Sequence, residues 1–527
     1  MPSKAGLCYA DNVSMLTVPI EVTTPDDAAA AVEAAQAASR AGADLIEWRL
    51  DSVVGLDGAG PCMATLLRDT SIESVLTCRS VQEGGSYQGG DEDLALWCNE
   101  IATLSEQPCW VDVEYAAWQR SGSLQAAASV LRGRGIKVLL SWHDFQARPH
   151  DLLRTARNMQ EAECDGVKLV WRARSVRDAV ECRDLLADRS KPMIALCMGP
   201  HGVLSRVMAG AWGGLMTFAA ADSTSATAPG QPTLMQLQDQ YRFRHLTPET
   251  EIFGLIGDPL GDSPGYRLHN AAFAAADFNG VYLPLPTAAG WESLKATLST
   301  LIGHPDIHFR GASVTLPHKS DLIRFVQERG GVVSPMAAAS GAANTLLVRD
   351  DGQVVADNTD VHGIMEPLRV RGAVFEGGRA VVLGAGGVAR AATCVLLQHG
   401  MQVDIVNRTI GRAEQLVKDF SSLGTIAARS SIEGAVDVIV QATSVGMAHG
   451  SSPQGNVLEA MSIGYDSLLK PNTVAIETVY DPVETPFVTR LKAAGCQVAT
   501  GQDMWRAQGA AQQMLWTGQA PPSSVWM

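Results

Sequence analysis

The sequence predicts an α/β chain in which an N-terminal (β/α)8 barrel precedes a small α/β domain and a Rossmann domain. Three observations support this prediction. Eight short β-rich runs alternate with Ala-rich helical segments over residues 1–232, as in a barrel of parallel strands. A polar stretch with Pro near both ends covers residues 231–251 and indicates a connection between domains. A strand, a Gly-rich turn and a helix follow one another over residues 379–400, which is how a Rossmann βαβ unit begins.

The eight runs expected to form the barrel are short and rich in β-branched or aromatic residues. They are Leu16–Ile20, Asp44–Leu50, Ser74–Arg79, Trp110–Tyr115, Val138–His143, Gly166–Val170, Met193–Met198 and Leu215–Ala220. An open doubly wound sheet is the alternative architecture, because it shows the same alternation of strands and helices.

Charged side chains lie near the C-terminal ends of most of these runs. They are Glu47, Arg49, Asp51, Arg79, Asp112, Glu114, His143, Asp144, Lys168 and, after the seventh run, Arg206. In a barrel these ends converge on one mouth, where barrel enzymes place their chemistry. The distribution of charge therefore favours the barrel over the open sheet.

The remaining chain divides into further segments. A linker is expected at 233–250, a small α/β domain at 251–365, a Rossmann domain at 366–490, and a helical segment returning to the small domain at 491–527. Within the small domain the expected strands are Ile252–Ile256, His308–Val314 and Asn344–Arg349.

Composition excludes several classes of protein. The formal net charge of -15 argues against a nucleic-acid partner, which normally meets a basic face. No apolar run of about 18 residues and no apolar stretch of signal-peptide length at the N-terminus occur, so no membrane association is expected. Ten scattered cysteines without a CxxC pair suggest free thiols in a reducing compartment, and hence a cytoplasmic protein. No metal site is expected, because His143 and His318 lack ligand partners at useful spacing.

Lys168, in the apolar run DGVKLVW, is a candidate nucleophile. Burial favours the neutral amine, which can attack a ketone. A lysine that extends to the barrel rim is the alternative. His143, at the end of the preceding run, could reach the same cavity as a general acid or base, or could be a buried histidine beside Asp144.

The first half resembles type I 3-dehydroquinate dehydratase. The motifs that carry the resemblance are EWRLD (47–51), TCRSVQEGG (77–85), SWHDF (141–145), GVKLV (166–170), SRV (205–207) and TAPGQ (227–231). The resemblance implies that Lys168 forms an imine with the substrate, that His143 is the acid/base and that Glu83 positions His143. It also implies substrate binding by Glu47, Arg49, Arg79, Arg206, Thr227 and Gln231. The family usually has Ser where Thr227 stands, so the hydroxyl is retained.

The turn GAGGVAR (384–390) predicts a pyrophosphate site, because side-chain-free residues allow a phosphate to approach a helix N-terminus. Asn407, Arg408 and Thr409 follow the next strand, where an NAD enzyme would carry an acidic residue. Arg408 favours NADP over NAD, since a cation there can neutralise a 2′-phosphate; a solvated surface charge is the alternative. Lys319 and Asp360 could form a proton-donating pair or a surface ion pair.

The second half resembles shikimate dehydrogenase. The motifs are GDPLGDSPGYRLHN (257–270), SVTLPHK (313–319), GAANT (341–345), NTD (358–360), GAGGVAR (384–390), NRT (407–409), ATSVGM (442–447), YDP (480–482) and GQDMWRAQGA (501–510). The resemblance implies that Lys319 and Asp360 are catalytic. It implies a substrate site at Ser263, Gly265, Thr315, Asn344, Tyr480 and Gln508, and an NADP site at Gly384, Ala385, Gly386, Gly387, Val388, Ala389, Asn407, Arg408, Thr409, Arg412, Thr443, Val445 and Gly501.

Two positions depart from the dehydrogenase motif. Gly265 replaces a substrate-binding hydroxyl, and Asp262 adds a negative charge near the expected substrate carboxylate. These changes motivate one alternative, a dehydrogenase that prefers quinate. A non-catalytic metabolite sensor built on the same folds is an alternative of a different class, but it would be expected to lose the chemical residues that this chain retains.

The sequence thus predicts a bifunctional enzyme of the shikimate pathway. Its expected ligands are 3-dehydroquinate, 3-dehydroshikimate, shikimate and NADP. The sequence makes no prediction about oligomeric state.

Overall fold

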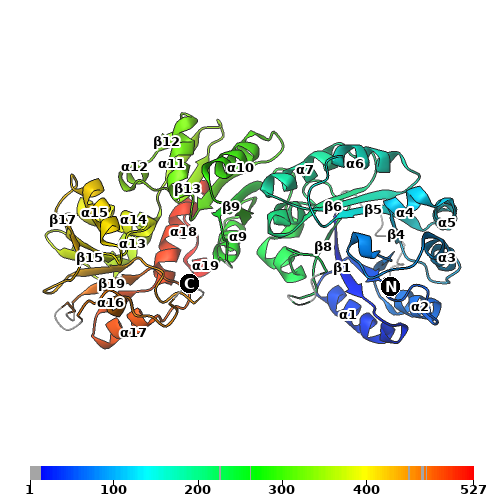
Figure 1. The fold of residues 1–527 in the computed structure, drawn as a ribbon, viewed down its shortest axis with the longest axis horizontal. Coiled ribbons are helices and arrows are strands. Elements are labelled where there is room, and N and C mark those ends of the chain that lie inside the picture. The colour runs from blue at the N-terminus through cyan, green and yellow to red at the C-terminus, as the bar shows by residue number, and fades with distance from the viewer. Residues whose placement is uncertain are drawn as a thin grey trace.

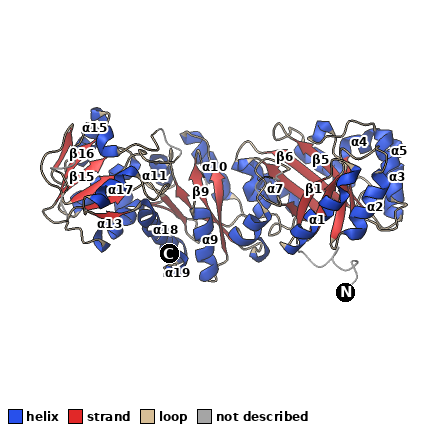
Figure 2. Ribbon diagram, turned by 90° about the horizontal axis from the view of Figure 1, so that it is seen from below, coloured by secondary structure: helices blue, strands red, loops and turns tan. Residues whose placement is uncertain are grey.

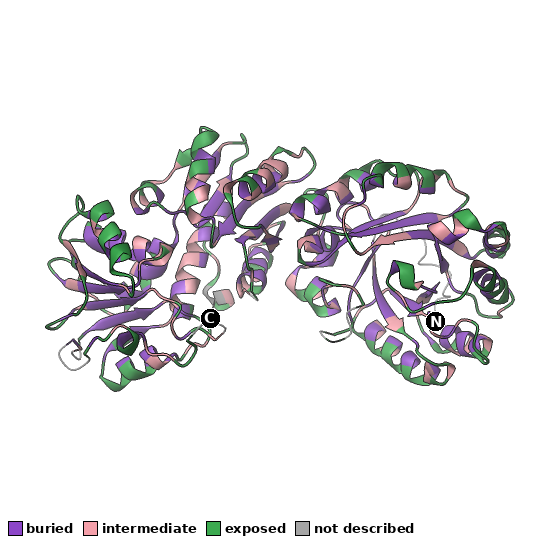
Figure 3. Ribbon diagram, viewed as in Figure 1, coloured by how far each residue is buried: buried purple, intermediate pink, exposed green. Residues whose placement is uncertain are grey.

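A computed structural model describes residues 14–526 except 223, 225–226, 262, 449–451, 465–467 and 470–471. Two lobes lie side by side in Figure 1. The N-terminal lobe, coloured blue to green, is the barrel, and the second lobe holds two further sheets. In each lobe the helices lie outside the strands (Figure 2), and the strands form the buried core (Figure 3).

Eight parallel strands form the first sheet in the order β7-β6-β5-β4-β3-β2-β1-β8. They are β1 (Met15–Glu21), β2 (Leu45–Arg49), β3 (Glu73–Thr77), β4 (Trp110–Glu114), β5 (Lys137–Asp144), β6 (Gly166–Arg172), β7 (Met193–Met198) and β8 (Met216–Phe218). A backbone hydrogen bond of 2.8 Å from Leu215 N–H to the Met193 carbonyl returns the sheet to β7. The sheet is therefore a nearly closed barrel, and the predicted barrel is confirmed.

Helices cover the outside of the barrel. They are α1 (Ala28–Arg40), α2 (Ala59–Asp69), α3 (Asp91–Ile101), α4 (Tyr115–Arg120), α5 (Gly122–Gly133), α6 (Leu152–Glu161), α7 (Val176–Ala187) and α8 (Val203–Val207). The buried residues of α1 are Ala28, Ala31, Val32, Ala35 and Ala38. This spacing of three and four places them on one face, and their small side chains let the helix approach the strands closely.

The linker packs against the N-terminal end of the barrel. It contains two single turns, Gln236–Gln240 and Phe243–His245. Arg244 donates to the Asp44 carboxylate at 2.9 Å and to the Gly42 carbonyl at 2.8 Å. The end of the barrel opposite the predicted mouth therefore carries the connection to the second lobe.

The second sheet has the order β10-β9-β11-β13-β14-β12. Its strands are β9 (Glu251–Gly257), β10 (Gly280–Pro286), β11 (Phe309–Val314), β12 (Val332–Val333), β13 (Thr345–Val348) and β14 (Val354–Asp357), and its helices are α9 (Gly265–Ala275), α10 (Trp291–Gly303), α11 (Lys319–Glu328) and α12 (Pro335–Ser340). Strand β10 was not predicted, and it contains Pro284 and Pro286. Because β10 is an edge strand bonded only to β9, prolines can be accommodated there.

The third sheet is parallel, with the order β17-β16-β15-β18-β19-β20. Its strands are β15 (Arg379–Leu383), β16 (Gln402–Val406), β17 (Ile426–Arg429), β18 (Val438–Gln441), β19 (Val474–Glu477) and β20 (Gln497–Ala499), with helices α14 (Gly387–Gln398), α15 (Ile410–Phe420), α16 (Val457–Ala460) and α17 (Pro486–Ala493). The domain boundary expected at residue 490 falls inside α17, and β20 extends the Rossmann sheet to Ala499. Three residues are enough to add a parallel strand here, but they are too few to give a sequence signal.

Two long helices join the second and third sheets. Helix α13 (Asp360–Val370) packs against α18 (Gly501–Thr517), which also contacts β11 and β13 of the second sheet. In Figure 1 α18 runs between the two sheets, and the short α19 (Ser523–Trp526) follows it. The C-terminal segment thus returns to the small domain.

The barrel contacts the edge of the second sheet. Helix α7 packs against α10, and α8 packs against β10. The His304 ring lies 3.0 Å from the Asp184 carboxylate, and Arg183 lies 3.5 Å from Asp306. Polar contacts therefore fix the orientation of the two lobes at their boundary.

Candidate active sites

A cavity opens at the C-terminal ends of the barrel strands. Its lining includes all nine residues predicted for the dehydratase site: Glu47, Arg49, Arg79, Glu83, His143, Lys168, Arg206, Thr227 and Gln231. They come from β2, β5, β6 and the segments that follow β3, β7 and β8. Parallel strands that end at the same rim bring these distant residues together.

Lys168 lies inside this cavity. Its side chain is only 6% exposed, and Nζ lies 3.1 Å from Glu47 Oε1 and 3.3 Å from Asp112 Oδ2. The ammonium also sits 4.2 Å from the ring centre of Phe218. The side chain is directed into the barrel and does not extend to solvent at the rim. Two carboxylates are close enough to accept a proton from it.

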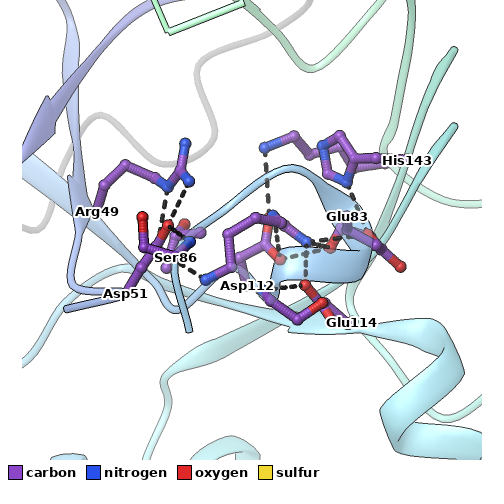
Figure 4. Close-up of polar contacts among 12 residues, drawn as sticks. Arg49, Asp51, Glu83, Ser86, Asp112, Glu114 and His143 are labelled. Carbon is purple, nitrogen blue, oxygen red and sulfur yellow. Dashed lines mark hydrogen bonds and ion pairs between the residues drawn. The ribbon is translucent and has the colours of Figure 1, made fainter. Parts of the chain in front are cut away.

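His143 and Glu83 form a buried pair (Figure 4). His143 Nδ1 lies 2.9 Å from Glu83 Oε2. Burial, together with the cations Arg79 and Lys168, holds the pKa of His143 well below its ordinary value, so the ring is neutral at neutral pH. Burial raises the pKa of Glu83 to about 8. A neutral imidazole held by a carboxyl group is suited to exchange a proton with a ligand.

Arg79 is surrounded by carboxylates of the protein itself, and Figure 4 labels its partners Glu83, Asp112 and Glu114. Its guanidinium lies 3.2 Å from Glu83, 2.8 Å from Asp112 and 3.4 Å from Glu114, and it donates to Ser141 Oγ at 2.7 Å. Burial opposes ionisation of Asp112, but Arg79 and Lys168 outweigh burial and lower its pKa. Arg79 therefore organises the floor of the cavity.

Arg206 and Gln231 retain hydrogen-bonding groups for a ligand. The Arg206 Nε donates to the Cys197 carbonyl at 3.0 Å, and burial lowers the pKa of Arg206 to about 10. No carboxylate pairs with Arg206 among the residues that the structure describes. Gln231 Oε1 accepts a hydrogen bond from Thr227 Oγ1 at 3.1 Å. Within the same described part, the buried Gln231 Nε2 has no partner.

A second cavity, of about 260 Å³, lies between the second and third sheets. Its lining includes the predicted residues Ser263, Gly265, Thr315, Lys319, Asn344, Asp360, Tyr480, Gly501 and Gln508. Lys319 Nζ lies 2.5 Å from Asp360 Oδ2. Asn344 Nδ2 donates to Asp360 Oδ1 at 2.8 Å and to Gln508 Oε1 at 3.3 Å. The Asp360 carboxylate is thus held on both oxygens.

The loop after β9 is changed where the motif departs from the family. Ser263 Oγ accepts a hydrogen bond from the Gly265 N–H at 3.2 Å. A side chain at Gly265 would begin 3.1 Å from Ser263 Oγ and 3.3 Å from Tyr282 Cε1. A side chain at residue 265 would therefore crowd both neighbours in the cavity wall. Asp262, the second departure, lies outside the described residues.

The predicted cofactor residues lie at the C-terminal edge of the third sheet. The Gly-rich turn, Gly384, Ala385, Gly386, Gly387, Val388 and Ala389, joins β15 to α14. Gly384 has a φ of +117°, and a side chain there would begin 2.7 Å from the Ala442 carbonyl. A side chain at Gly386 would enter open space at the N-terminus of α14. This arrangement fits a pyrophosphate that lies against backbone N–H groups.

The other predicted cofactor residues follow neighbouring strands. Asn407, Arg408, Thr409 and Arg412 lie after β16, and both arginines are exposed. Thr443 and Val445 follow β18, where Gln441 holds their backbone. Gly501 differs from the rest: it lines the second cavity, and a side chain there would begin 2.0 Å from the Val479 carbonyl. Gly501 is therefore required for packing beneath the Tyr480 loop.

Comparison with known proteins agrees with both halves. Residues 17–248 match the family model for type I 3-dehydroquinase, 255–346 the shikimate dehydrogenase substrate binding domain, and 369–449 shikimate / quinate 5-dehydrogenase. The bifunctional 3-dehydroquinate dehydratase/shikimate dehydrogenase of Arabidopsis thaliana is 30% identical over 92% of this chain and 79% of that protein. The chain belongs to this bifunctional family.

Other relatives match the whole chain or one half. The shikimate biosynthesis protein AroDE of Chlamydia pneumoniae is 26% identical over 90% of both chains. The NADP(+) shikimate dehydrogenase of Carboxydothermus hydrogenoformans is 34% identical over 53% of this chain and 95% of that protein. A structure of dehydroquinate dehydratase and shikimate dehydrogenase from S. pombe AroM covers 98% of both chains, with 24% identity and a TM-score of 0.42.

The family assignment confirms the predicted bifunctional dehydratase and dehydrogenase and favours it over the non-catalytic sensor. Among the described residues of the bifunctional enzyme, no cluster of three His, Cys, Asp or Glu could hold a metal ion. In the same part of the chain, no helix is both long and apolar enough to cross a membrane.

Several residues around the two cavities were not assigned a role from the sequence. In the dehydratase half these are Asp112, Glu114 and Ser141, which surround Arg79 and Lys168. The sequence WVDVE could have indicated Asp112 and Glu114, because its charged residues alternate and alternate residues of a barrel strand face inward. In the dehydrogenase half His269, Tyr282 and Trp505 line the cavity. Burial lowers the pKa of His269 to about 3, so this ring is neutral.

Proposed function

We propose that the barrel converts 3-dehydroquinate to 3-dehydroshikimate and that the second lobe reduces this product to shikimate with NADPH. The observation that carries the proposal is the position of Lys168, whose amine lies inside the barrel cavity within reach of two carboxylates and beside the His143–Glu83 pair. A buried amine with proton acceptors can become a nucleophile toward a ketone.

In the proposed dehydration Lys168 Nζ attacks the ketone carbon, and one water leaves as the imine forms. Glu47 or Asp112, at 3.1 and 3.3 Å, accepts the proton that Lys168 must lose first. His143 removes the proton on the carbon beside the imine. The C–O bond two carbons from the imine then breaks, and the departing hydroxyl takes the proton from His143. Hydrolysis of the imine releases 3-dehydroshikimate and restores Lys168.

The substrate contacts are assigned to hydrogen-bonding groups in the cavity that other protein groups do not already occupy. Among the described residues the Arg206 guanidinium has no carboxylate partner, and a guanidinium can bind a carboxylate through two N–H groups. Gln231 Nε2 and Thr227 line the same cavity. Arg49 and Glu47, from β2, also line it and are assigned to ring hydroxyls. Arg79 is assigned a smaller share of substrate binding than the sequence suggested, because its N–H groups already meet three carboxylates.

In the proposed reduction NADPH supplies a hydride when it is bound at the Gly-rich turn. Lys319 holds a proton at Nζ and donates it to the ketone oxygen of the substrate. Asp360 Oδ2, at 2.5 Å from Nζ, orients that group. Asn344, Gln508 and Thr315 orient the substrate, and Ser263 and Tyr480 complete the wall. Arg408 and Arg412 are assigned to the 2′-phosphate, which makes the cofactor NADP.

Two matched variants test the two halves of this proposal separately. We expect wild-type protein to oxidise NADPH when given either 3-dehydroquinate or 3-dehydroshikimate. Lys168→Met should lose only the first reaction, on the order of 10³-fold or more, and Lys319→Met should lose both. Borohydride with 3-dehydroquinate should add mass to the peptide that contains Lys168. A Lys168→Met protein that still converts 3-dehydroquinate would contradict the imine mechanism.

A reducing compartment, the cytoplasm, is the proposed location. Among the described residues, free thiols are carried by the buried Cys62, Cys78, Cys98, Cys164, Cys182, Cys197 and Cys394. Buried thiols without disulfides are typical of proteins from reducing compartments. Fractionation of the source cells with antibody detection tests this proposal, and recovery in an organelle, as the name of the chloroplastic Arabidopsis relative would suggest, would contradict it.

A further inference from the structure

Arg390 connects the cofactor-binding helix to the substrate domain. It is the fourth residue of α14, and its Nε donates to the Ser340 carbonyl at 2.9 Å. Its NH1 donates to Asp419 Oδ2 at 2.5 Å, and its guanidinium lies 5.1 Å from the ring centre of Phe420. Ser340 ends α12 of the second sheet, whereas Asp419 and Phe420 end α15 of the third. One side chain therefore contacts both domains of the dehydrogenase.

The C-terminal end of α12 and the glycine that follows it both favour the contact between Ser340 and Arg390. The last carbonyls of a helix have no partner within the helix, and a cation is favourable there. Gly341 ends α12 in the left-handed region, with a φ of +65°. A side chain at Gly341 would begin 3.0 Å from the Arg390 NH2. The glycine thus permits both the helix end and the approach of the guanidinium.

Segment 340–344 leads from this contact to both catalytic residues. The Ala343 N–H donates to the Lys319 carbonyl at 2.8 Å. Asn344 Nδ2 donates to the Asp360 carboxylate at 2.8 Å. Asn358 Nδ2 binds Ser340 Oγ and the Ala342 carbonyl, both at 3.0 Å. A shift at Ser340 would therefore be transmitted to Lys319 and to Asp360.

Arg390 is also linked, through its own helix, to the proposed pyrophosphate site. The Arg390 N–H donates to the Gly386 carbonyl at 2.9 Å, so Arg390 belongs to the first turn of α14. A side chain at Gly387 would begin 3.5 Å from Lys319 Cδ. One turn of a helix moves as a rigid unit. An anion bound at Gly386 and the hydrogen bond to Ser340 would therefore both restrain the first turn of α14.

We infer that Arg390 is a positioning residue that couples cofactor binding to the geometry of the Lys319–Asp360 pair. The inference rests on the proposed dehydrogenase function and adds a route between its two ligand sites. When the cofactor orders the N-terminus of α14, Arg390 holds α12 and segment 340–344 against it. Substrate and cofactor then bind cooperatively, and each raises the affinity for the other by the same factor.

Calorimetry with a pair of ligands that cannot react tests this coupling without relying on turnover. Shikimate is titrated into the full-length protein with and without NADPH. We expect NADPH to tighten shikimate binding in the wild type. Arg390→Met, which keeps the apolar stem but removes the hydrogen bonds, should reduce that enhancement by about tenfold, the equivalent of one charge-assisted hydrogen bond. Arg390→Lys should restore part of it.

Asp419→Asn is the matched control. It weakens the contact of Arg390 inside the third sheet but leaves the bond to Ser340, so the enhancement by NADPH should persist. Dehydration of 3-dehydroquinate should be equal in all variants, because the barrel is untouched, and it controls for the amount of protein in each assay. In steady-state reduction, Arg390→Met should raise the KM for 3-dehydroshikimate more than it lowers kcat.

Three results would overturn the inference: no enhancement in the wild type, full enhancement in Arg390→Met, or an equal loss in Asp419→Asn and Arg390→Met. The last would mean that Arg390 only stabilises the nucleotide domain. Failure of the proposed function would appear differently, as a wild-type protein that does not reduce 3-dehydroshikimate with NADPH.

Discussion

Gln441 and Glu477 lie opposite one another at the C-terminal ends of β18 and β19, and each side chain turns back to hold the loop that follows it. Gln441 Oε1 accepts from the Thr443 N–H at 2.8 Å. Glu477 accepts from the Val479 N–H at 2.9 Å and from Thr485 Oγ1 at 2.8 Å. Both residues are fully buried. The loops that carry Thr443 and Tyr480 to the proposed cofactor and substrate sites are therefore anchored from beneath.

Glu477→Gln should change how the stability of the dehydrogenase depends on pH. Burial raises the pKa of Glu477 from 4.5 to about 7, so the folded state holds this proton more tightly than the unfolded chain. That contribution is complete below pH 4.5 and is lost as the pH rises through 7. The difference corresponds to about 3 kcal/mol. The Tm of the variant relative to wild type should therefore increase by roughly 5 °C between pH 5 and pH 8.

The exposed Glu459→Gln is the control for this experiment, because removing a solvated carboxylate should not alter the pH dependence. A constant difference in Tm between Glu477→Gln and wild type across this range would show that Glu477 keeps an ordinary pKa in the folded protein.

Glu83→Gln should alter the pH profile of the dehydratase. His143 can accept a proton on its free nitrogen only when its Nδ1–H is donated to Glu83, and an ionised Glu83 favours that tautomer. Since the pKa of Glu83 is about 8, wild-type kcat/KM should rise as the pH increases through 8. The variant should lack this rise, and its plateau should fall by roughly 10²-fold. Initial rates between pH 6 and 9.5 measure both effects, and an unchanged profile in the variant would assign the titration to another group.

Arg408→Ala should reduce the preference for NADPH. Arg408 is exposed immediately after β16, where it can meet a 2′-phosphate, and losing one charge-assisted contact corresponds to about tenfold or more in affinity. We expect the KM for NADPH to rise by that factor while the KM for NADH stays the same. Lys418→Ala removes an exposed cation from the far end of α15 and should have no effect. Equal changes for both cofactors would place Arg408 away from the 2′-phosphate.

Gly265→Ser should change which ring the dehydrogenase accepts. The new side chain would begin 3.1 Å from Ser263 Oγ and 3.3 Å from Tyr282, so it would press on both residues and narrow the wall beside the substrate. We expect the ratio of kcat/KM for shikimate to that for quinate to rise by about tenfold. Dehydratase activity serves as the folding control. A ratio that stays the same would mean that residue 265 does not face the ring.

Local sequence was sufficient for most elements and for the membership of both cavities. The eight barrel strands and the three strands predicted in the small domain were placed within two residues of their bounds, because their signal is contained in their own sequence. Strands β14, β17, β18 and β19, of four residues each, were not predicted. Strand β10 was missed because two prolines obscure that signal, and β20 because three residues carry almost none. The presence of β20 depends on its pairing with β19, and no local sequence pattern indicates that pairing.

The sequence by itself determined the order of the domains, the chemistry available in each half and the residue types at both sites, because periodicity and motif spacing are properties of neighbouring residues. Only the tertiary structure decided which charged groups meet. Arg79 meets Glu83 from the turn after β3 and both Asp112 and Glu114 from β4. Lys319 meets Asp360 across 41 residues, and Arg390 reaches Ser340 in another domain. Electrostatic interactions depend on distance in space and on burial, and both are set by how the sheets pack.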